Sequence, residues 1–534
     1  MLDRAWRLTD ANAYVQDDIK VTSSLTVNLG VRYERLANFG DELGRNSGFD
    51  IALANPNPPA SGTIVGTVVS ANFPGTVPAG VKQLDNKYGI RGEHEHNVGP
   101  RVGFAWRLPP SFVPLTERTV LRGGYGVYYT RATGRPFVQL VGGPPFATRR
   151  VLTGVPNAAA SFANPFGPDL TFPQFPAYSP TTQRSLSIID QGYRPPVTQQ
   201  FSLNFQTDLG RSFLLEAGYV GTRGTHQVLN RSVNQARLAS PANPIRGETT
   251  NTVANIPLRV PIQGFTAPGL INIESSSSSR YHGLETSVTK RLSNGLQFLA
   301  AYTFSRAYST SAANTSASGI GGFSGDQSDL QSSYGRSDFN REHRAVLSYV
   351  YQVPGPRTSN AFWDSLFGGW SVAGVTTLQS GLPLSLTGTN ANNVFGITND
   401  RAQLVPNCEL TPSSSVKSRL DSYFNQSCIL RNSTGAAIWP VVGDDGRATA
   451  FGNSGVGIVF GPSQRNFDIV LIKRTSLQAL REGSNIEFRA EFFNAFNTPQ
   501  FSNPNTNVSA ATFGVVSSTA VNPRIIQLAL KLSF

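Results

Sequence analysis

The sequence predicts an all-β fold, an antiparallel transmembrane β-barrel with short periplasmic turns and long extracellular loops. Three observations predict it. Apolar and polar residues alternate with a period of two in blocks of about ten residues, the length of a tilted strand that spans a membrane. The links between these blocks are alternately short and long. No apolar run reaches the roughly 18 residues that a transmembrane helix needs.

The composition suits many strands joined by turns and polar loops. Of the 534 residues, 39% are hydrophobic and only 15% are charged, while Gly (51) and Pro (35) are plentiful. The net charge is +12, but Lys and Arg are scattered along the chain without a basic tract or a nucleic-acid-binding module. We therefore expect a cationic lumen and loops, and no nucleic-acid partner.

The alternation is clearest in residues 25–34, where Leu25, Val27, Leu29, Val31 and Tyr33 occupy every second position. A helix would need apolar residues at three- and four-residue spacing, which this segment lacks. Similar segments predict about 13 to 14 strands in all. They are 102–108, 121–129, 197–205, 213–219, 284–304 (a hairpin), 345–353, 370–378, 467–473, 486–494 and 524–534.

The links between these strands support a barrel that spans the outer membrane. Short links are 22–24, the region of Gly210 and Arg211, and 293–295, where Asn294-Gly295 tolerates the positive φ of a tight hairpin. Long links are about 37–96, 132–196, 225–280, 309–341 and 387–464. A soluble sandwich rarely carries five long structureless loops, and no regular period indicates a propeller.

The segment 524–534 has the sharpest pattern. Ile526, Leu528, Leu530, Leu532 and Phe534 share one face. An apolar outer face suits lipid, and a final aromatic suits the membrane boundary. A soluble protein that ended on this strand would expose a sticky edge, so we predict a strand that closes a barrel.

The first residues, 1–7, lack the features of a secretory signal. Because an exported protein needs one, we expect an incomplete chain rather than a cytosolic protein. Cys408 and Cys428 lie in one polar segment, which favours a disulfide in an external loop over two free thiols. Two cysteines alone make no structural zinc site.

The sequence indicates no catalytic, cofactor or metal site. His94, Glu95 and His96 are able to chelate a metal, but a solvated loop is the favoured interpretation. Ser414 and Lys417 match an S-x-x-K motif, yet the companion motifs of that enzyme class are missing. We predict that the protein is not an enzyme.

Several stretches together resemble a known family. They are 14–18 leading into 25–34, 100–105 with 122–126, 218–226, 488–497 and the terminal Phe534. In this order and over nearly the whole chain, they resemble the barrel portion of TonB-dependent receptors, specifically the large Oar-like branch.

The resemblance implies that residues 1–534 form the C-terminal part of a barrel of about 22 strands, with roughly eight strands absent. Such receptors also carry a signal peptide, an N-terminal regulatory-like domain, a TonB box and a plug, none of which is visible here. The resemblance implies that the terminal strand is recognised by the barrel assembly machinery. That role falls on Leu528, Leu530, Leu532 and Phe534.

The function so implied is uptake of a large extracellular solute, such as an oligosaccharide or a peptide, by a barrel set in outer-membrane lipid. The TonB complex supplies energy through the missing plug and TonB box. One alternative is a structural or adhesive surface barrel without energised transport. Another is a secreted β-rich enzyme, whose activity would depend on residues such as Ser414 or His94.

Overall fold

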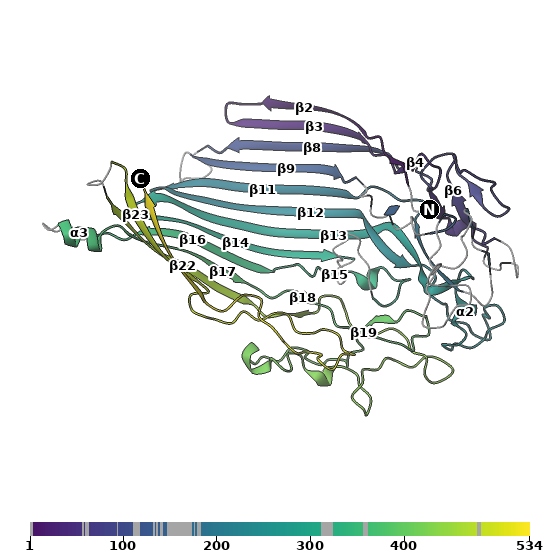
Figure 1. Ribbon diagram of the computed structural model, residues 1–534. Coiled ribbons are helices and arrows are strands. Elements are labelled where there is room, and N and C mark those ends of the chain that lie inside the picture. Colours follow the sequence, from purple (N-terminus) through teal and green to yellow (C-terminus); the bar gives the residue numbers. More distant parts are fainter. Residues whose placement is uncertain are drawn as a thin grey trace, which may run out of the picture.

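The computed structural model describes residues 4–55, 58, 63–92, 94–109, 118–131, 183–310, 324–355, 361–477 and 482–534, with short pieces between 134 and 178. One large sheet dominates this part of the chain, and long loops gather at one end of its strands (Figure 1). Among the described residues, no helix has both the length and the apolar character needed to cross a membrane.

Thirteen strands follow one another along the sheet, and each pairs antiparallel with the next, in agreement with the prediction. In spatial order they are β2 (Ala11–Lys20), β3 (Leu25–Arg35), β8 (His96–Arg107), β9 (Thr119–Tyr129), β11 (Val197–Gly210), β12 (Phe213–Ser232), β13 (Phe265–Ser293), β14 (Leu296–Ser309), β16 (His343–Gln352), β17 (Trp370–Gln379), β22 (Gln464–Ser476), β23 (Asn485–Phe493) and β24 (Ile525–Ser533). Two shorter strands join this sheet: β10 (Arg184–Ile189) runs parallel to β13, and β15 (Gly335–Arg336) pairs with β14.

The register places the apolar residues of neighbouring strands on one face. Leu29 lies opposite Val102, and Val27 lies opposite Phe104, whereas Asn28 faces Gly103 on the other side. Leu29 remains 43% exposed. Exposed apolar rows on one face and polar rows on the other are the arrangement of a membrane-spanning sheet, with lipid outside and water inside. We call these two sides the lipid face and the lumen face.

The tight turns lie together at one end of the strands. The β13–β14 turn has Asn294 and Gly295 at φ of 51° and 74°, which is the positive-φ pair that a type I′ hairpin requires. The β11–β12 turn uses Arg211 and Ser212, also at positive φ. The helix α3 (Ala361–Phe367) and the C-terminus lie at this end too (Figure 1).

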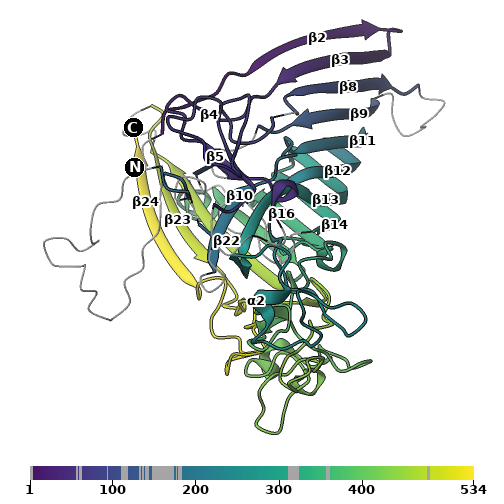
Figure 2. The same cartoon turned by 90° about the vertical axis from the view of Figure 1, so that its right-hand side faces the viewer.

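The sheet is curved but open. It bends from β2 round to β24, and Figure 2 shows the trough that results. Within the described residues, β24 pairs with β23 alone and β2 pairs with β3 alone. The closing contact expected for the terminal strand is therefore not formed by these residues.

The expected structureless loop over 225–280 is wrong in its bounds. β12 continues to Ser232 and β13 begins at Phe265, so both strands run far beyond the level where the other strands end. A register shift after Gly224, with His226 at a φ of 55°, bends β12 before it continues. The polar run Ser275–Ser279 hid this extension, because a strand outside the membrane needs no apolar face.

The other long links also contain regular structure. Their short elements are β1 (Trp6–Arg7), β4 (Gly40–Asp41), β5 (Ser47–Phe49), β6 (Thr67–Val69), β7 (Lys82–Gln83), β18 (Pro383–Leu384), β19 (Thr387–Thr389), β20 (Asn399–Arg401), β21 (Val459–Phe460), the helix α2 (Ile256–Arg259) and the 3-10 turns η1 (Ile51–Leu53), η2 (Gln331–Ser333), η3 (Val416–Arg419) and η4 (Gln426–Cys428). Several hydrophobic clusters lie among them, so the described parts of these links are packed and not structureless.

The largest of these clusters belongs to two links that flank β22 and β23. Its buried members are Leu386, Ala402, Tyr423, Phe424, Ile429, Trp439, Val459, Val508 and Phe513. We call residues 380–463 and 494–524 together the cap, because they form one unit with a core of its own at the long-loop end. Burial of aromatic and branched side chains in such a core is the main source of its stability.

Candidate functional site: the lumen face and the long-loop end

The lumen face of the first strands carries a broad hollow with both polar and apolar lining. It has a volume of about 600 Å³ and is lined by Gln16, Asn28, Arg101, Tyr128, Gln200, Asn204 and several glycines. The guanidinium of Arg101 lies 4.7 Å from the centre of the Tyr128 ring, which is close enough for a cation–π contact. Hydrogen-bond donors and acceptors on a concave wall are suited to a hydrated polar solute.

The lumen face of the last strands is bridged by ion pairs. Glu487 accepts hydrogen bonds from Arg474 and from Arg489, the latter at 2.5 Å. Arg489 also lies 3.9 Å from Glu491. These contacts form a salt-bridged wall on the side that faces the lumen.

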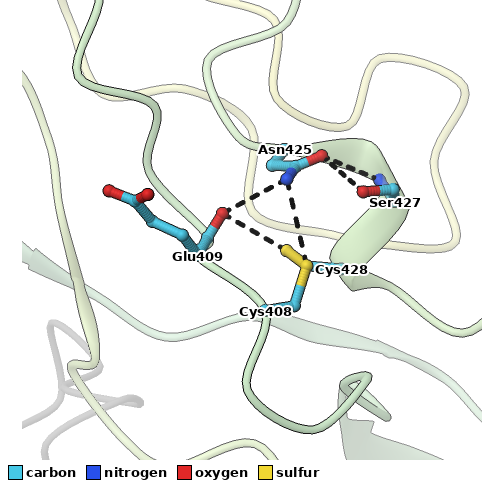
Figure 3. Close-up of a disulfide and its surroundings, with 5 residues drawn as sticks. All are labelled: Cys408, Glu409, Asn425, Ser427 and Cys428. Atoms are coloured by element: carbon cyan, nitrogen blue, oxygen red, sulfur yellow. Dashed lines mark hydrogen bonds between the residues drawn. A yellow bond between two sulfur atoms is a disulfide. The ribbon is translucent and has the colours of Figure 1, made fainter.

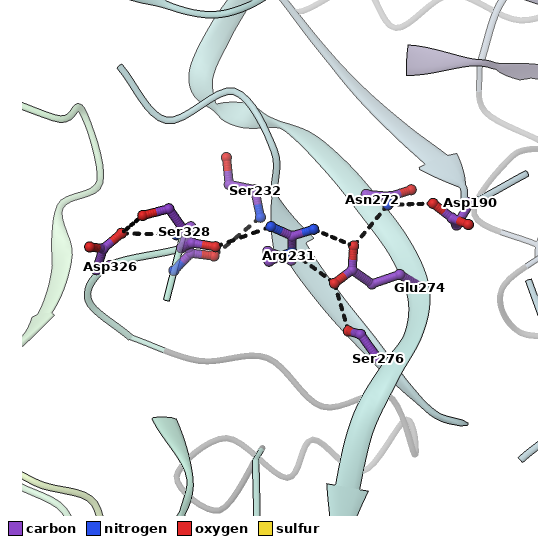
Figure 4. Close-up of polar contacts among 9 residues, drawn as sticks. Asp190, Arg231, Ser232, Asn272, Glu274, Ser276, Asp326 and Ser328 are labelled. Atoms are coloured by element: carbon purple, nitrogen blue, oxygen red, sulfur yellow. Dashed lines mark hydrogen bonds and ion pairs between the residues drawn. The ribbon is translucent and has the colours of Figure 1, made fainter. Parts of the chain in front are cut away.

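The polar centre of the long-loop end is the Arg231–Glu274 pair (Figure 4). Arg231 lies on the extension of β12 and donates to both carboxylate oxygens of Glu274 on β13, at 2.7 and 2.8 Å. Glu274 also accepts from Asn272 at 2.9 Å and from Ser276 at 2.6 Å. Asn272 reaches Asp190 beside β10 at 3.2 Å, so one network holds three strands together.

The same network fixes a further loop. The backbone N–H of Ser232 donates to the side chain of Gln327 at 3.1 Å, and Arg231 donates to the Gln327 carbonyl at 3.3 Å. Gln235 donates to Asp326 at 2.8 Å. A bidentate arginine–carboxylate pair with its other lone pairs satisfied is a rigid support. It holds the loops above the lumen in one arrangement.

The two cysteines are joined in the cap. Figure 3 shows the disulfide between Cys408 and Cys428 beside the 3-10 turn η4. Asn425 caps this turn by accepting hydrogen bonds from the N–H and the hydroxyl of Ser427, at 3.2 and 2.7 Å. The Asn425 amide also donates to the Glu409 carbonyl at 3.3 Å. The disulfide and the hydrogen bonds of Asn425 together hold residues 408–410 against residues 425–428.

A buried carboxyl group lies within the cap. Asp400 is fully buried and accepts hydrogen bonds from the Asn390 amide at 3.0 Å and from the backbone N–H of Arg401 at 2.7 Å. Burial raises the pKa of Asp400 above its ordinary value. Burial also lowers the pKa of the neighbouring Arg401 guanidinium. For both side chains, removal from water is therefore the largest cause of the pKa shift.

An open hollow of about 660 Å³ lies on the cap surface between its two segments. Asp421, Gln426 and Thr434 come from the first segment, and Ser509 and Phe513 come from the second. Phe513 is only 4% exposed and belongs to the core of the cap, so the polar side chains form the part of the hollow that a solute can reach.

The residues of the terminal strand lie on the lipid face. Leu528, Leu530 and Leu532 face Ala490, Phe488 and Ile486 of β23 in the register. They are 66%, 70% and 56% exposed, and Phe534 is 82% exposed. An apolar row with a terminal aromatic is thus displayed on an open edge. The role of these residues in assembly stays a prediction.

Two of the weaker candidates for chemistry, Glu95 and His96, have structural partners. Glu95 pairs with Arg35 at 2.8 Å, and His96 pairs with the Tyr33 hydroxyl at 2.6 Å. Ser415, next to Ser414, caps η3 through the N–H of Ser418. Across the described ranges, no group of three or more His, Cys, Asp or Glu side chains is placed to hold a metal ion.

Sequence reasoning missed one recurrent feature, the pairing of lone histidines with tyrosines. His282 accepts or donates a hydrogen bond at 2.6 Å with Tyr219, and His343 does so at 2.8 Å with Tyr302. Each pair is diagonal across two neighbouring strands on the lipid face. The available signal was a histidine near the end of a strand, at one of the alternate positions that otherwise hold apolar residues.

In the described part of the chain, the sheet and its loops define a membrane-spanning β protein whose packed long loops gather at one end. The family model described as "Outer membrane beta barrel domain" matches residues 2–527. The chain therefore belongs to the outer-membrane β-barrel family, and its location is the outer membrane. In such barrels the short turns face the periplasm and the long loops face outward.

Two solved structures with a similar fold are distant from this chain in sequence. The outer membrane transporter YddB from Escherichia coli is 11% identical, with a TM-score of 0.44 over 98% of this chain and 45% of that chain. The FrpB iron transporter from Neisseria meningitidis is 12% identical, with a TM-score of 0.40 over 98% and 46%. The chain thus spans less than half the length of these proteins. No curated protein matches it.

Proposed function

We propose that this chain is the C-terminal part of a TonB-dependent receptor of the Oar-like branch that imports a large solute across the outer membrane. The observation that carries the proposal is the open sheet, which has an apolar lipid face and a polar lumen face. Its first strand, β2, and its last strand, β24, each have a partner on one side within the described residues. In lipid, an unpaired strand edge leaves several backbone groups unsatisfied, so the barrel must be completed by further strands.

The size of the completed barrel favours transport of a large solute. Thirteen strands already form an open trough, and closure with roughly eight or nine more gives a barrel of about 22 strands. Barrels of this size have a lumen wide enough for a plug. In the proposal, the plug and the TonB box precede the chain, and the TonB complex acts on them.

The cap provides the proposed recognition surface. Its hollow of about 660 Å³ lies at the outward end and is lined by polar side chains, among them Asp421 and Gln426. The hollow is open and mostly polar, which fits an oligosaccharide or a peptide better than a small apolar ligand. The network around Arg231 and the disulfide keep the surrounding loops in place.

The test starts with the protein isolated from the outer membrane of its own bacterium. Mass spectrometry of the mature protein establishes whether strands, a plug and a TonB box precede β2. Uptake is then measured with fluorescein-labelled oligosaccharides and peptides, in cells with and without TonB. The proposal expects uptake that disappears without TonB.

Two outcomes contradict the proposal. A mature protein without a plug, or surface binding of the probes without TonB-dependent entry, indicates the structural or adhesive alternative. The variant Asp421→Ala examines the cap directly, with Glu409→Ala as the control, since Glu409 is an exposed acid outside the hollow. Only the first is expected to weaken capture of the probes.

The proposal extends to the terminal strand as an assembly signal. The supporting observation is the row Leu528, Leu530 and Leu532, which ends at Phe534 on an exposed edge. Deletion of Phe534 is expected to reduce the amount of heat-modifiable protein in the outer membrane. Phe496→Ala is the control, because Phe496 is a similarly exposed ring outside β24. Equal insertion of both variants contradicts this role.

A further inference from the structure

Two arginines lie directly opposite each other on the lipid face. Arg223 of β12 and Arg280 of β13 are partners in the antiparallel register, and both are exposed. Arg280 has the same parity as His282 and Leu284, which belong to the lipid face. The strands β12 and β13 run side by side near the middle of the sheet (Figure 1).

This placement is unfavourable unless something compensates for it. Residues directly opposite in an antiparallel pair have Cβ atoms about 5 Å apart, and like charges at that distance destabilise the sheet. In the described part of the chain, no carboxylate forms an ion pair with Arg223 or Arg280. The pair therefore concentrates two uncompensated positive charges.

A neighbouring arginine on the same face, in contrast, has a carboxylate partner. Arg306 of β14 lies opposite His282, and it forms an ion pair with Glu342 at 3.0 Å. The chain thus supplies a carboxylate for an arginine one row below the pair. The contrast makes an external anion the natural partner of Arg223 and Arg280.

The height of the pair above the periplasmic turns places it among lipid headgroups. Arg280 faces Tyr308, which lies about 12 residues along β14 from its start at Leu296. With a rise of about 3.3 Å per residue and a tilt of about 40°, this distance corresponds to roughly 30 Å along the membrane normal. The apolar band of such barrels is only about 25 Å tall. The arginines therefore lie just outside the hydrocarbon, at the outer surface.

An aromatic row lies directly beneath them. Tyr219 and His282 are joined by a 2.6 Å hydrogen bond, and their rings lie near Phe201. Tyrosine rings are enriched at the boundary between acyl chains and headgroups. From the membrane centre outward, the surface thus presents apolar side chains, then rings, then two guanidinium groups. A phosphorylated lipid has acyl chains and then a phosphate in the same direction.

We infer that Arg223 and Arg280 form a binding site for the phosphate of an outer-leaflet lipid. The ligand chemistry is a phosphate group attached to acyl chains, as in lipid A. Guanidinium groups bind phosphate through charge-assisted, often bidentate hydrogen bonds. A bound phosphate between the two side chains removes the repulsion between them, so the lipid also stabilises the pairing of β12 with β13.

The site is tested with the full-length protein purified in dodecyl maltoside. Lipid A is titrated, and bound lipid is counted by native mass spectrometry. Replacement of both arginines by glutamine (Arg223→Gln with Arg280→Gln) is expected to weaken binding by about thirtyfold, from the usual contribution of each basic residue at a membrane surface. The control is Arg122→Gln with Arg344→Gln, which removes the same charge from the lumen face.

Other probes identify the source of the phosphate. Phosphatidylcholine, whose headgroup carries no net charge, is expected to bind without discrimination between the variants. Inorganic phosphate is expected not to displace lipid A at equal concentration, because it lacks the acyl chains. If inorganic phosphate competes equally, the lipid assignment is wrong. If the arginine variant binds lipid A as the native protein does, or if the control loses as much, the site is refuted. Gel mobility before and after heating verifies that each variant is folded.

Discussion

Removal of the cap disulfide by Cys408→Ala with Cys428→Ala is expected to destabilise the cap by about 3 kcal/mol. The cross-link spans a sequence separation of 20, and the loop-closure entropy for a loop of that length gives about this value. Alanine preserves the apolar surroundings of the buried Cys428. The remaining core, with Phe424 stacked on Phe513 at 5.5 Å, keeps the cap folded but easier to open.

Hydrogen exchange in the full-length protein measures this loss where it occurs. The N–H of Val405 bonds to the Cys428 carbonyl, and the N–H of Tyr423 bonds to the Gly514 carbonyl, both at 2.9 Å. A loss of about 3 kcal/mol corresponds to exchange about 150-fold faster at such amides. Amides of β3 and β14 serve as the internal control, and their rates are expected to stay the same. Unchanged rates in the cap, or equal acceleration in the strands, refute the reasoning.

Three further predictions concern the network, the wall and the buried carboxyl. Glu274→Gln removes the negative charge that binds Arg231 and is expected to lower the local free energy of unfolding by about 2 kcal/mol. The loss is measured as faster proteolysis within 324–333. Proteolysis at the native rate contradicts this prediction. Gly221→Val places a Cβ only 2.1 Å from the ring of Phe201, which is expected to cost about 2 kcal/mol and lower the heat-unfolding midpoint. Gly124→Ala, whose nearest neighbour lies at 3.6 Å, is the control. Because burial raises the pKa of Asp400, its contribution to cap stability is complete below the ordinary value of about 3.9 and is lost as the pH rises through the raised value. Asp400→Asn is expected to flatten the pH dependence of cap opening in urea, followed by tryptophan fluorescence, and an unchanged slope opposes this assignment.

Much of the membrane-spanning sheet was predictable because lipid imposes a simple rule. A strand between lipid and a wet lumen must alternate, so residues such as Leu29 and Val31 reveal both the strand and its outward face. The turn at Asn294 and Gly295 was equally visible, since few other residue pairs tolerate positive φ. The family model supports the same outer-membrane assignment.

The long-loop end was not predictable for the opposite reason. Outside the membrane no period of two is required, so the extensions of β12 and β13 read as polar sequence. The core of the cap brings Phe424 next to Phe513, which lie in different links and appear in sequence as isolated rings. The opposition of Arg223 and Arg280 likewise depends on a register that no local pattern specifies.

The division of the cap between two links has a consequence for biogenesis. Its first segment precedes β22 and its second lies between β23 and β24, so the shared core forms only after the chain has been placed through β23 and the link that follows it. The Cys408–Cys428 bond lies within the first segment and requires nothing from the second. An antibody against the surface shared by both segments would therefore stain only molecules whose strands are in place through β23, and would leave earlier assembly intermediates unstained.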